Sequence, residues 1–121
     1  MTSNYDKQSL PPDKLLHYDN MIGMNSEIDR KGATLPYTSV NGNMFTFFSK
    51  DGTINIRLPE KERLDFMNTF EARLSVQHGV TLKEYVVVPE SLLENTILLL
   101  HYLNISFEYA KTLKPKPSKK K

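Results

Sequence analysis

"SVNGNMFTFFSKDGTINIRL", residues 39–58, decides the fold that this sequence predicts. The pairs Asn41-Gly42 and Asp51-Gly52 are signals for tight turns, because these residue types accept the positive φ angles that two-residue hairpins require. Strands that are joined by tight turns must be antiparallel. The stretch therefore predicts a meander of three strands, over about residues 34–40, 43–49 and 54–58.

Alternation along these strands predicts which side chains share a face of the sheet. In the second strand, Phe45 and Phe47 are expected on one face, and their neighbours on the other: Met44, Thr46 and Phe48. In the third strand, Asn55 and Arg57 are expected on a wetter face, and the apolar residues face the core: Ile54, Ile56 and Leu58.

Further elements are expected on both sides of the meander. A first helix is predicted over about residues 12–23, where apolar residues recur at spacings of three and four. A second helix starts after Pro59, and its apolar stripe extends to Leu74. A fourth strand is predicted over 82–88, followed by a helix that begins at Pro89 and a last helix over about 104–113. This order predicts an α+β fold, an antiparallel sheet with helices packed on one face.

The composition is that of an ordinary globular protein of 121 residues. We expect a flexible N-terminus over 1–10, one domain over 11–113 and a disordered lysine-rich tail over 114–121. The absence of cysteine excludes disulfides, thiolate metal sites and a thiol nucleophile. No apolar run approaches the roughly 20 residues of a membrane helix, and the N-terminus lacks a secretory pattern, so a cytoplasmic location is expected.

The net charge of +2 hides an asymmetry between the tail and the rest of the chain. Residues 1–113 carry 11 basic and 14 acidic residues, a balance of −3, and the tail adds five lysines: Lys114, Lys116, Lys119, Lys120 and Lys121. Such a tail can attract nucleic acid without sequence preference, or it can serve as a solubilising end.

The residue types that usually catalyse reactions or bind metal ions do not form a recognisable motif in this sequence. His17, His78 and His101 lack the spacing of zinc ligands. The serines lack the G-x-S-x-G motif, and the glutamates that begin helices are explained by the helix dipole. We therefore predict no catalytic residue, no cofactor site and no metal site, and we do not expect an enzyme.

A candidate interaction surface remains on the predicted sheet. It comprises Tyr37, Arg57, Lys83 and Tyr85, which strand alternation places away from the helices. Aromatic rings beside cations could stack on the bases of a nucleic acid or form part of a protein-binding surface, and both alternatives stay open. Three other rings are expected to pack beneath the helices: Phe45, Phe47 and Phe48.

Two longer runs resemble a known family. They are "KGATLPYTSVNGNMFTFFSKDGTINIRLPEKERLDF", residues 31–66, and "KEYVVVPESLLENTILLLHYLNISFEYAKTL", residues 83–113. Their outline resembles the N-terminal domain of the TfoX/Sxy family and, more distantly, the MmcQ/YjbR-like group. The resemblance covers about residues 27–113 and is carried by the following positions: Gly42, Met44-Phe45, Gly52, Arg57, Tyr85, Val88-Pro89 and the helix from Glu90.

The resemblance implies a TfoX-like α+β fold and a small cytoplasmic protein of bacteria. It also implies a non-enzymatic regulatory or adaptor role, in which the partner is another protein. The alternative is a nucleic-acid-binding module that uses the sheet face and the basic tail.

Overall fold

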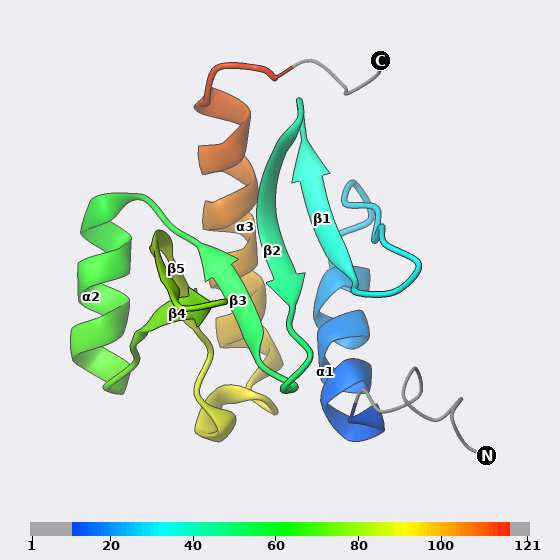
Figure 1. The fold of residues 1–121 in the computed structure, drawn as a ribbon, viewed down its shortest axis with the longest axis vertical. Helices are drawn as coiled ribbons and strands as arrows, with labels where there is room; N and C mark the ends of the chain where they lie inside the picture. Colours follow the sequence, from blue (N-terminus) through cyan, green and yellow to red (C-terminus); the bar gives the residue numbers. More distant parts are fainter. Residues whose placement is uncertain (1–10, 117–121) are drawn as a thin grey trace.

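The computed structural model describes residues 11–116 and has an α+β fold, in which three helices accompany a five-stranded antiparallel sheet (Figure 1). The strand order in the sheet is β1-β2-β3-β5-β4. The elements along the chain are α1 (Pro12–Gly23), β1 (Tyr37–Val40), β2 (Asn43–Phe48), β3 (Ile54–Arg57), α2 (Glu60–Phe70), β4 (Leu74–Gln77), β5 (Val80–Val87), the 3₁₀ turn η2 (Glu90–Leu92) and α3 (Thr96–Thr112).

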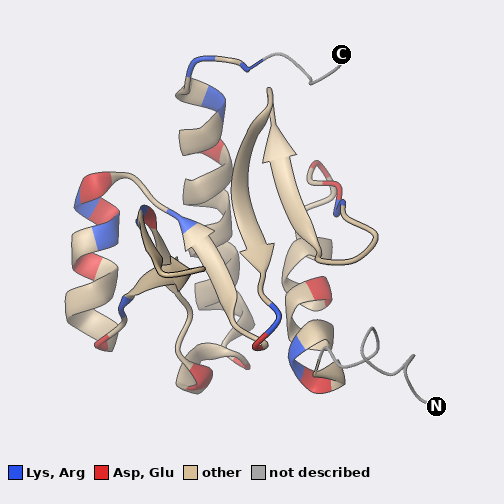
Figure 2. Cartoon of the chain, in the orientation of Figure 1, with Lys and Arg blue, Asp and Glu red and all other residues tan. Residues whose placement is uncertain are grey.

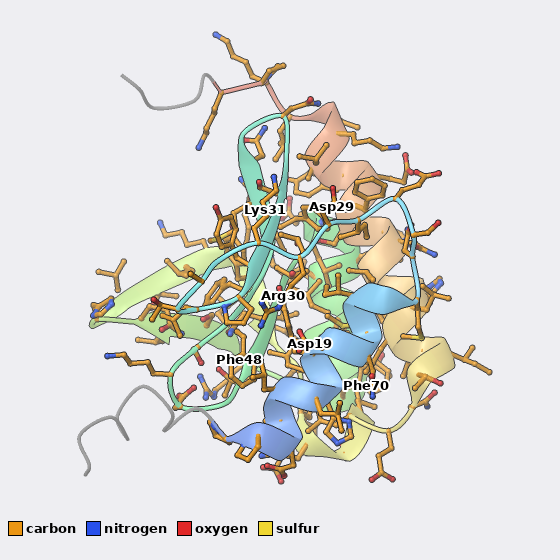
Figure 3. All side chains as sticks on the ribbon, turned by 90° about the vertical axis from the view of Figure 1, so that its right-hand side faces the viewer. Asp19, Asp29, Arg30, Lys31, Phe48 and Phe70 are labelled. Atoms are coloured by element: carbon orange, nitrogen blue, oxygen red, sulfur yellow. The ribbon has the colours of Figure 1, made fainter. Side chains whose placement is uncertain are left out.

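All three helices contribute to one core against the sheet. Seen from the side, α1 and α3 lie together on one side of the strands (Figure 3). Fully buried side chains come from each layer: Tyr18 and Met21 of α1, Phe66 of α2, Leu99 and Leu103 of α3, and Phe48, Ile54, Ile56 and Val86 of the sheet. A continuous apolar core of this kind is the main source of stability in a small domain.

The predicted meander is confirmed. β1, β2 and β3 pair as antiparallel neighbours, and Asn41 and Gly42 in the first turn have φ angles of 53° and 80°. The expected inward row of the third strand is also confirmed, since Ile54, Ile56 and Leu58 are at most 1% exposed. The helix that was expected over about 12–23 coincides with α1.

A β-bulge in the first hairpin changes the face of Phe45. Thr38 pairs with Thr46, whereas the next residue, Ser39, pairs with Met44, so Phe45 is an extra residue in β2. A bulge places two consecutive side chains on the same side of the sheet. Phe45 and Thr46 are accordingly both fully buried.

The prediction that Phe45 and Phe47 share a face was therefore wrong. The ring of Phe45 packs toward α3, with its centre 5.5 Å from that of Phe107. The ring of Phe47 lies on the opposite face of the sheet, 5.4 Å from that of Tyr85. Asn55 lies on the face opposite to Ile54 and Ile56, as expected, but it is not wet: Asn55 is fully buried, and its amide nitrogen donates to the carbonyl oxygen of Phe47 at 3.3 Å.

The sheet has a strand, β4, that the sequence reading assigned to a helix. Helix α2 ends at Phe70, and Glu71 follows it in the left-handed conformation with φ 55°. Leu74 then begins β4 instead of extending the helical stripe. A tight turn at His78 and Gly79, with φ 52° and 76°, reverses the chain into β5.

The C-terminal part also differs from the prediction. One long helix, α3, replaces the two expected helices, and the amide oxygen of Asn95 caps it by accepting a hydrogen bond from the N–H of Leu98 at 3.2 Å. The start of the tail, expected to be disordered, contacts the first hairpin: Lys116 N–H donates to the carbonyl oxygen of Asn41 at 2.8 Å. The remainder of the tail, 117–121, and the N-terminal residues 1–10 lie outside the described residues.

Candidate binding groove on the sheet

The face of the sheet that points away from α1 and α3 carries a row of paired side chains. Register places Tyr37 opposite Phe47, Phe47 opposite Asn55, and Asn55 opposite Val87. Cross-strand partners lie on the same face of a sheet. The rings of Tyr37 and Phe47 therefore lie next to each other on the face opposite to Phe45 and Thr46, whose side chains contact α3 and α1.

An irregularity in the last hairpin makes this face concave. Leu74 pairs with Val86, but the next residue, Ser75, pairs with Leu82, so three residues of β5 lie between these two pairings. Such extra residues bend a strand and increase its twist. The outer half of the β4–β5 hairpin accordingly projects from the sheet on the side away from the helices (Figure 3).

A cavity of about 630 Å³, here called the sheet groove, lies on this concave side. Most of its lining is apolar and comes from three segments, the loop before β1, the first hairpin and β5: Leu35, Pro36, Tyr37, Met44, Phe47, Phe48 and Leu82. The polar lining residues are Ser49, Lys50, Gln77 and His78, with no aspartate or glutamate among them. Binding sites for organic groups combine such apolar walls with a few polar groups.

Apolar side chains are also exposed close to the sheet groove. Leu35, which lines it, is 36% exposed. Val80 is 59% exposed and pairs with Gln77, so it shares a face of the hairpin with a lining residue. Exposed apolar side chains that gather around a concavity are typical of interaction sites.

The β2–β3 turn brings the hydroxyl of Ser49 and the carboxylate of Asp51 to the edge of the sheet groove. Ser49 Oγ donates to the carboxylate of Asp51, which also accepts from the N–H of Thr53 at 3.2 Å. The bond from Ser49 is the main reason why the pKa of the Asp51 carboxyl lies below its ordinary value. Within the described residues, Ser49 Oγ forms hydrogen bonds with Asp51 and Thr53 and with no histidine that could activate it as a nucleophile.

The predicted surface residues Arg57 and Tyr85 lie together but are engaged in the fold. Arg57 Nε donates to Glu84 Oε1 at 2.7 Å, and Arg57 Nη1 donates to the carbonyl oxygen of Met44 at 3.3 Å. The hydroxyl of Tyr85 donates to the same carbonyl at 2.7 Å, and burial raises the pKa of that hydroxyl. The hydroxyl of Tyr109 donates to the second oxygen of Glu84 at 3.1 Å.

The four predicted surface residues thus have different surroundings. Tyr37 lines the sheet groove, whereas Arg57 and Tyr85 form an internally bonded cluster, with the guanidinium carbon 5.7 Å from the ring centre. Lys83 is exposed on β5. Of the tail lysines, Lys114 and Lys116 follow α3 beside the first hairpin, and the other three lie outside the described residues: Lys119, Lys120 and Lys121.

Sequence reasoning did not anticipate the residues that build the walls of the groove. Leu35, Gln77 and Leu82 come together only because the last hairpin is bent toward the first. The His78-Gly79 pair was the available signal, since histidine is one of the few non-glycine residues enriched at positive φ.

In residues 11–116, no group of three or more histidine, aspartate or glutamate side chains is arranged to hold a metal ion. No helix in this range combines the length and the apolar character needed to cross a membrane.

Comparisons with protein-family models, with curated proteins and with solved structures found no match for this chain. The interpretation of the sheet groove therefore depends on the geometry of the groove itself.

Proposed function

We propose that this protein is a non-enzymatic regulatory or adaptor module that binds a segment of a partner protein in the sheet groove. The observation that supports this most strongly is an apolar concavity of about 630 Å³ on the face of the sheet opposite to the side chains that pack on α3. Its volume lies within the roughly 300–1,000 Å³ that is usual for sites that bind organic groups. Burial of Leu35, Phe47 and Leu82 by a partner would supply the hydrophobic driving force.

We also propose that the chain is a TfoX-like domain of the bacterial cytoplasm. The support is that several of the positions carrying the resemblance lie in turns or at the ends of strands and helices. Gly42 and Gly52 form the turns of the meander, with φ angles of 80° and 87°. Arg57 ends β3, and Pro89 immediately precedes η2.

A protein partner is favoured over nucleic acid by the charges on the sheet. Strands β1 and β2 carry no lysine or arginine (Figure 2), and Arg57 on β3 already pairs with Glu84. Over residues 11–116 the sequence contains 12 basic and 13 acidic residues, so this part has a formal charge of −1. Nucleic-acid-binding domains usually carry clustered positive charge on the folded surface.

The proposal is tested by site-specific photo-cross-linking in cells of the native host. A benzoylphenylalanine replaces Leu35 in the sheet groove, and a matched variant carries it in place of Ile97, an apolar residue of α3 that is 83% exposed. We expect a discrete protein adduct from position 35 that position 97 does not give. The adduct should disappear when Val80→Glu is added, because a charge there opposes apolar binding.

Three results would contradict the proposal. Identical adducts from positions 35 and 97 would indicate nonspecific contact. A nuclease-sensitive adduct would support the nucleic-acid alternative, above all if deletion of residues 114–121 or added salt removes it. An adduct that persists at full yield in the Val80→Glu variant would show that the groove is not the binding surface.

A further inference from the structure

Among residues 11–116, the sheet groove is lined by a cationic side chain and by no aspartate or glutamate. Lys50 lines the groove in the β2–β3 turn and is exposed. Within residues 11–116, Lys50 takes part in none of the five salt bridges found. Since none of the described residues that line the groove is an aspartate or glutamate, an occupant that bears a carboxylate would be attracted by Lys50 and not repelled by this lining.

The acidic residue nearest to Lys50 in the chain is already engaged. The carboxylate of Asp51 accepts hydrogen bonds from the hydroxyl of Ser49 and from the N–H and hydroxyl of Thr53, the latter two at 3.2 and 3.0 Å. A carboxylate that is satisfied by donors of its own turn is poorly placed to turn toward the neighbouring lysine. Lys50 therefore has no ion-pair partner within residues 11–116 and is available to a carboxylate of a bound partner.

The rest of the lining determines what must accompany that carboxylate. Tyr37, Met44 and Phe47 form an apolar floor, and Leu35 and Leu82 lie on segments at its sides. Apolar and aromatic side chains of an occupant would bury area against them. Gln77 and His78 add polar side chains on the hairpin, which suit the backbone of an extended peptide.

We propose that the sheet groove binds an extended segment of a partner protein in which apolar or aromatic side chains lie close to an acidic residue that pairs with Lys50. This inference rests on the proposed function and names the chemistry of the partner. It does not involve Arg57 or Tyr85, whose polar atoms are bonded within the fold.

The probe is a phage-displayed library of random peptides, selected on the full chain. We expect enriched peptides that combine aromatic or aliphatic residues with aspartate or glutamate. A synthetic copy of the best peptide should bind about tenfold more weakly to Lys50→Glu, since attraction is replaced by repulsion. The matched control, Lys61→Glu on α2, reverses the charge of a side chain that is 82% exposed. It should leave the affinity for the peptide unchanged.

A second selection makes the test reciprocal. The same library selected on the Lys50→Glu variant should enrich lysine or arginine in place of the acidic residues, with the apolar residues retained. Leu35→Glu, a change in a loop before β1, should abolish binding of both peptide classes. Circular dichroism of each variant shows whether it is folded.

The outcomes separate the two proposals. The selected peptides could depend on Leu35 but show no enrichment of acidic residues and bind the Lys50→Glu variant with unchanged affinity. That result would overturn this inference and leave the proposed function standing. Failure to enrich peptides, or enrichment of peptides that ignore Leu35→Glu, would overturn both. Dimerisation that Leu35→Glu abolishes, or peptide binding that emerges only after residues 1–10 are removed, would assign the groove to a second copy or to the chain's own N-terminus and would also overturn the inference.

Discussion

Arg57 and Glu84 join β3 to β5 at the end of the sheet through an ion pair, in which Nε lies 2.7 Å from Oε1. The second carboxylate oxygen of Glu84 accepts from the hydroxyl of Tyr109 at 3.1 Å, so the same carboxylate also connects the sheet to α3. Side-chain exposure is 18% for Arg57 and 37% for Glu84. The pair thus lies between the surface, where ion pairs contribute little, and the interior.

Replacement of this carboxylate should make stability less dependent on pH. Burial of Glu84 opposes its ionisation, but the hydrogen bond and charge of Arg57, aided by Tyr109, outweigh burial and hold the pKa below the ordinary 4.5. A lowered pKa stabilises the fold above the unfolded value, and this contribution is lost as the pH falls through the folded value. Glu84→Gln should therefore cost about 1 kcal/mol at pH 7, allowing for solvent screening, and much less near pH 3.

Urea unfolding of both proteins at pH 7, 5 and 3 measures this difference. Glu108→Gln is the control, because its carboxylate pairs with Lys111 on the surface and is 68% exposed. A destabilisation by Glu84→Gln that stays constant across the three pH values would refute the electrostatic explanation.

The contact between Gly42 and the tail predicts unequal effects of two similar substitutions. Gly42 and Gly79 occupy equivalent turns, with φ angles of 80° and 76°. A Cβ at Gly42 would lie 2.3 Å from the carbonyl oxygen of Lys116, whereas nothing lies within 4 Å of one at Gly79. Alanine should cost about 1–2 kcal/mol at either site because of the left-handed backbone, and Gly42→Ala should cost more than Gly79→Ala.

Truncation after Leu113 provides the control for the tail. Removal of residues 114–121 removes the obstructing carbonyl, so the two alanine variants should then be equally destabilised in thermal unfolding. If Gly42→Ala and Gly79→Ala already cost the same in the full chain, residues 114–116 do not pack on the hairpin as described.

Much of the fold follows from chemistry that is local in the sequence. Asn41-Gly42 determines the first turn because few other dipeptides accept two positive φ angles, and Gly52 supplies the positive φ of the second turn. The third hairpin escaped prediction because His78-Gly79 is a less common form of the same turn, and because Glu71 ends α2 in the left-handed region, where glycine is usual. Apolar residues keep helical spacing as far as Leu74, so this spacing could not reveal that α2 ends at Phe70.

The site is less predictable because it depends on two strand irregularities. Strict alternation along β2 would place Phe45 and Phe47 on the same face of the sheet. The bulge at Phe45 places the two rings on opposite faces. The bend in β5 between Leu82 and Val86 depends on the pairing of β5 with two different strands, β4 and β3. Tyr37 could be identified from sequence as a surface residue, but the groove that it lines could not.

The bulge predicts that two phenylalanines separated by one residue differ in their contribution to stability. Phe45 is fully buried against Phe107, so Phe45→Ala should cost about 3–5 kcal/mol through lost contacts and a cavity. Phe47 is partly exposed in the sheet groove, so Phe47→Ala should cost clearly less. Denaturant unfolding at pH 7 measures both values. Equal costs would mean that the two rings share an environment, as strict alternation requires.

A chain of buried hydroxyl groups links α1 to the sheet. Tyr18 Oη lies 2.8 Å from Thr46 Oγ1, which lies 2.7 Å from Thr38 Oγ1, and all three residues are fully buried. Tyr18→Phe removes one end and leaves the threonine pair, so it should cost about 0.5–1.5 kcal/mol. Thr46→Val removes the middle and leaves two buried hydroxyls unpaired, so it should cost more, at about 1–3 kcal/mol for each hydroxyl.

The same tyrosine predicts how stability falls at alkaline pH. Burial raises the pKa of the Tyr18 hydroxyl far above the ordinary 10.0, in spite of its bond to Thr46. Since the unfolded chain ionises this group near its ordinary value, its contribution is present below about pH 10 and is lost as the pH rises further. Tyr18→Phe should therefore reduce the loss of stability between pH 9 and 11. Chemical unfolding across that range measures the difference, and parallel curves for the two proteins would show that Tyr18 is accessible to ionisation in the folded state.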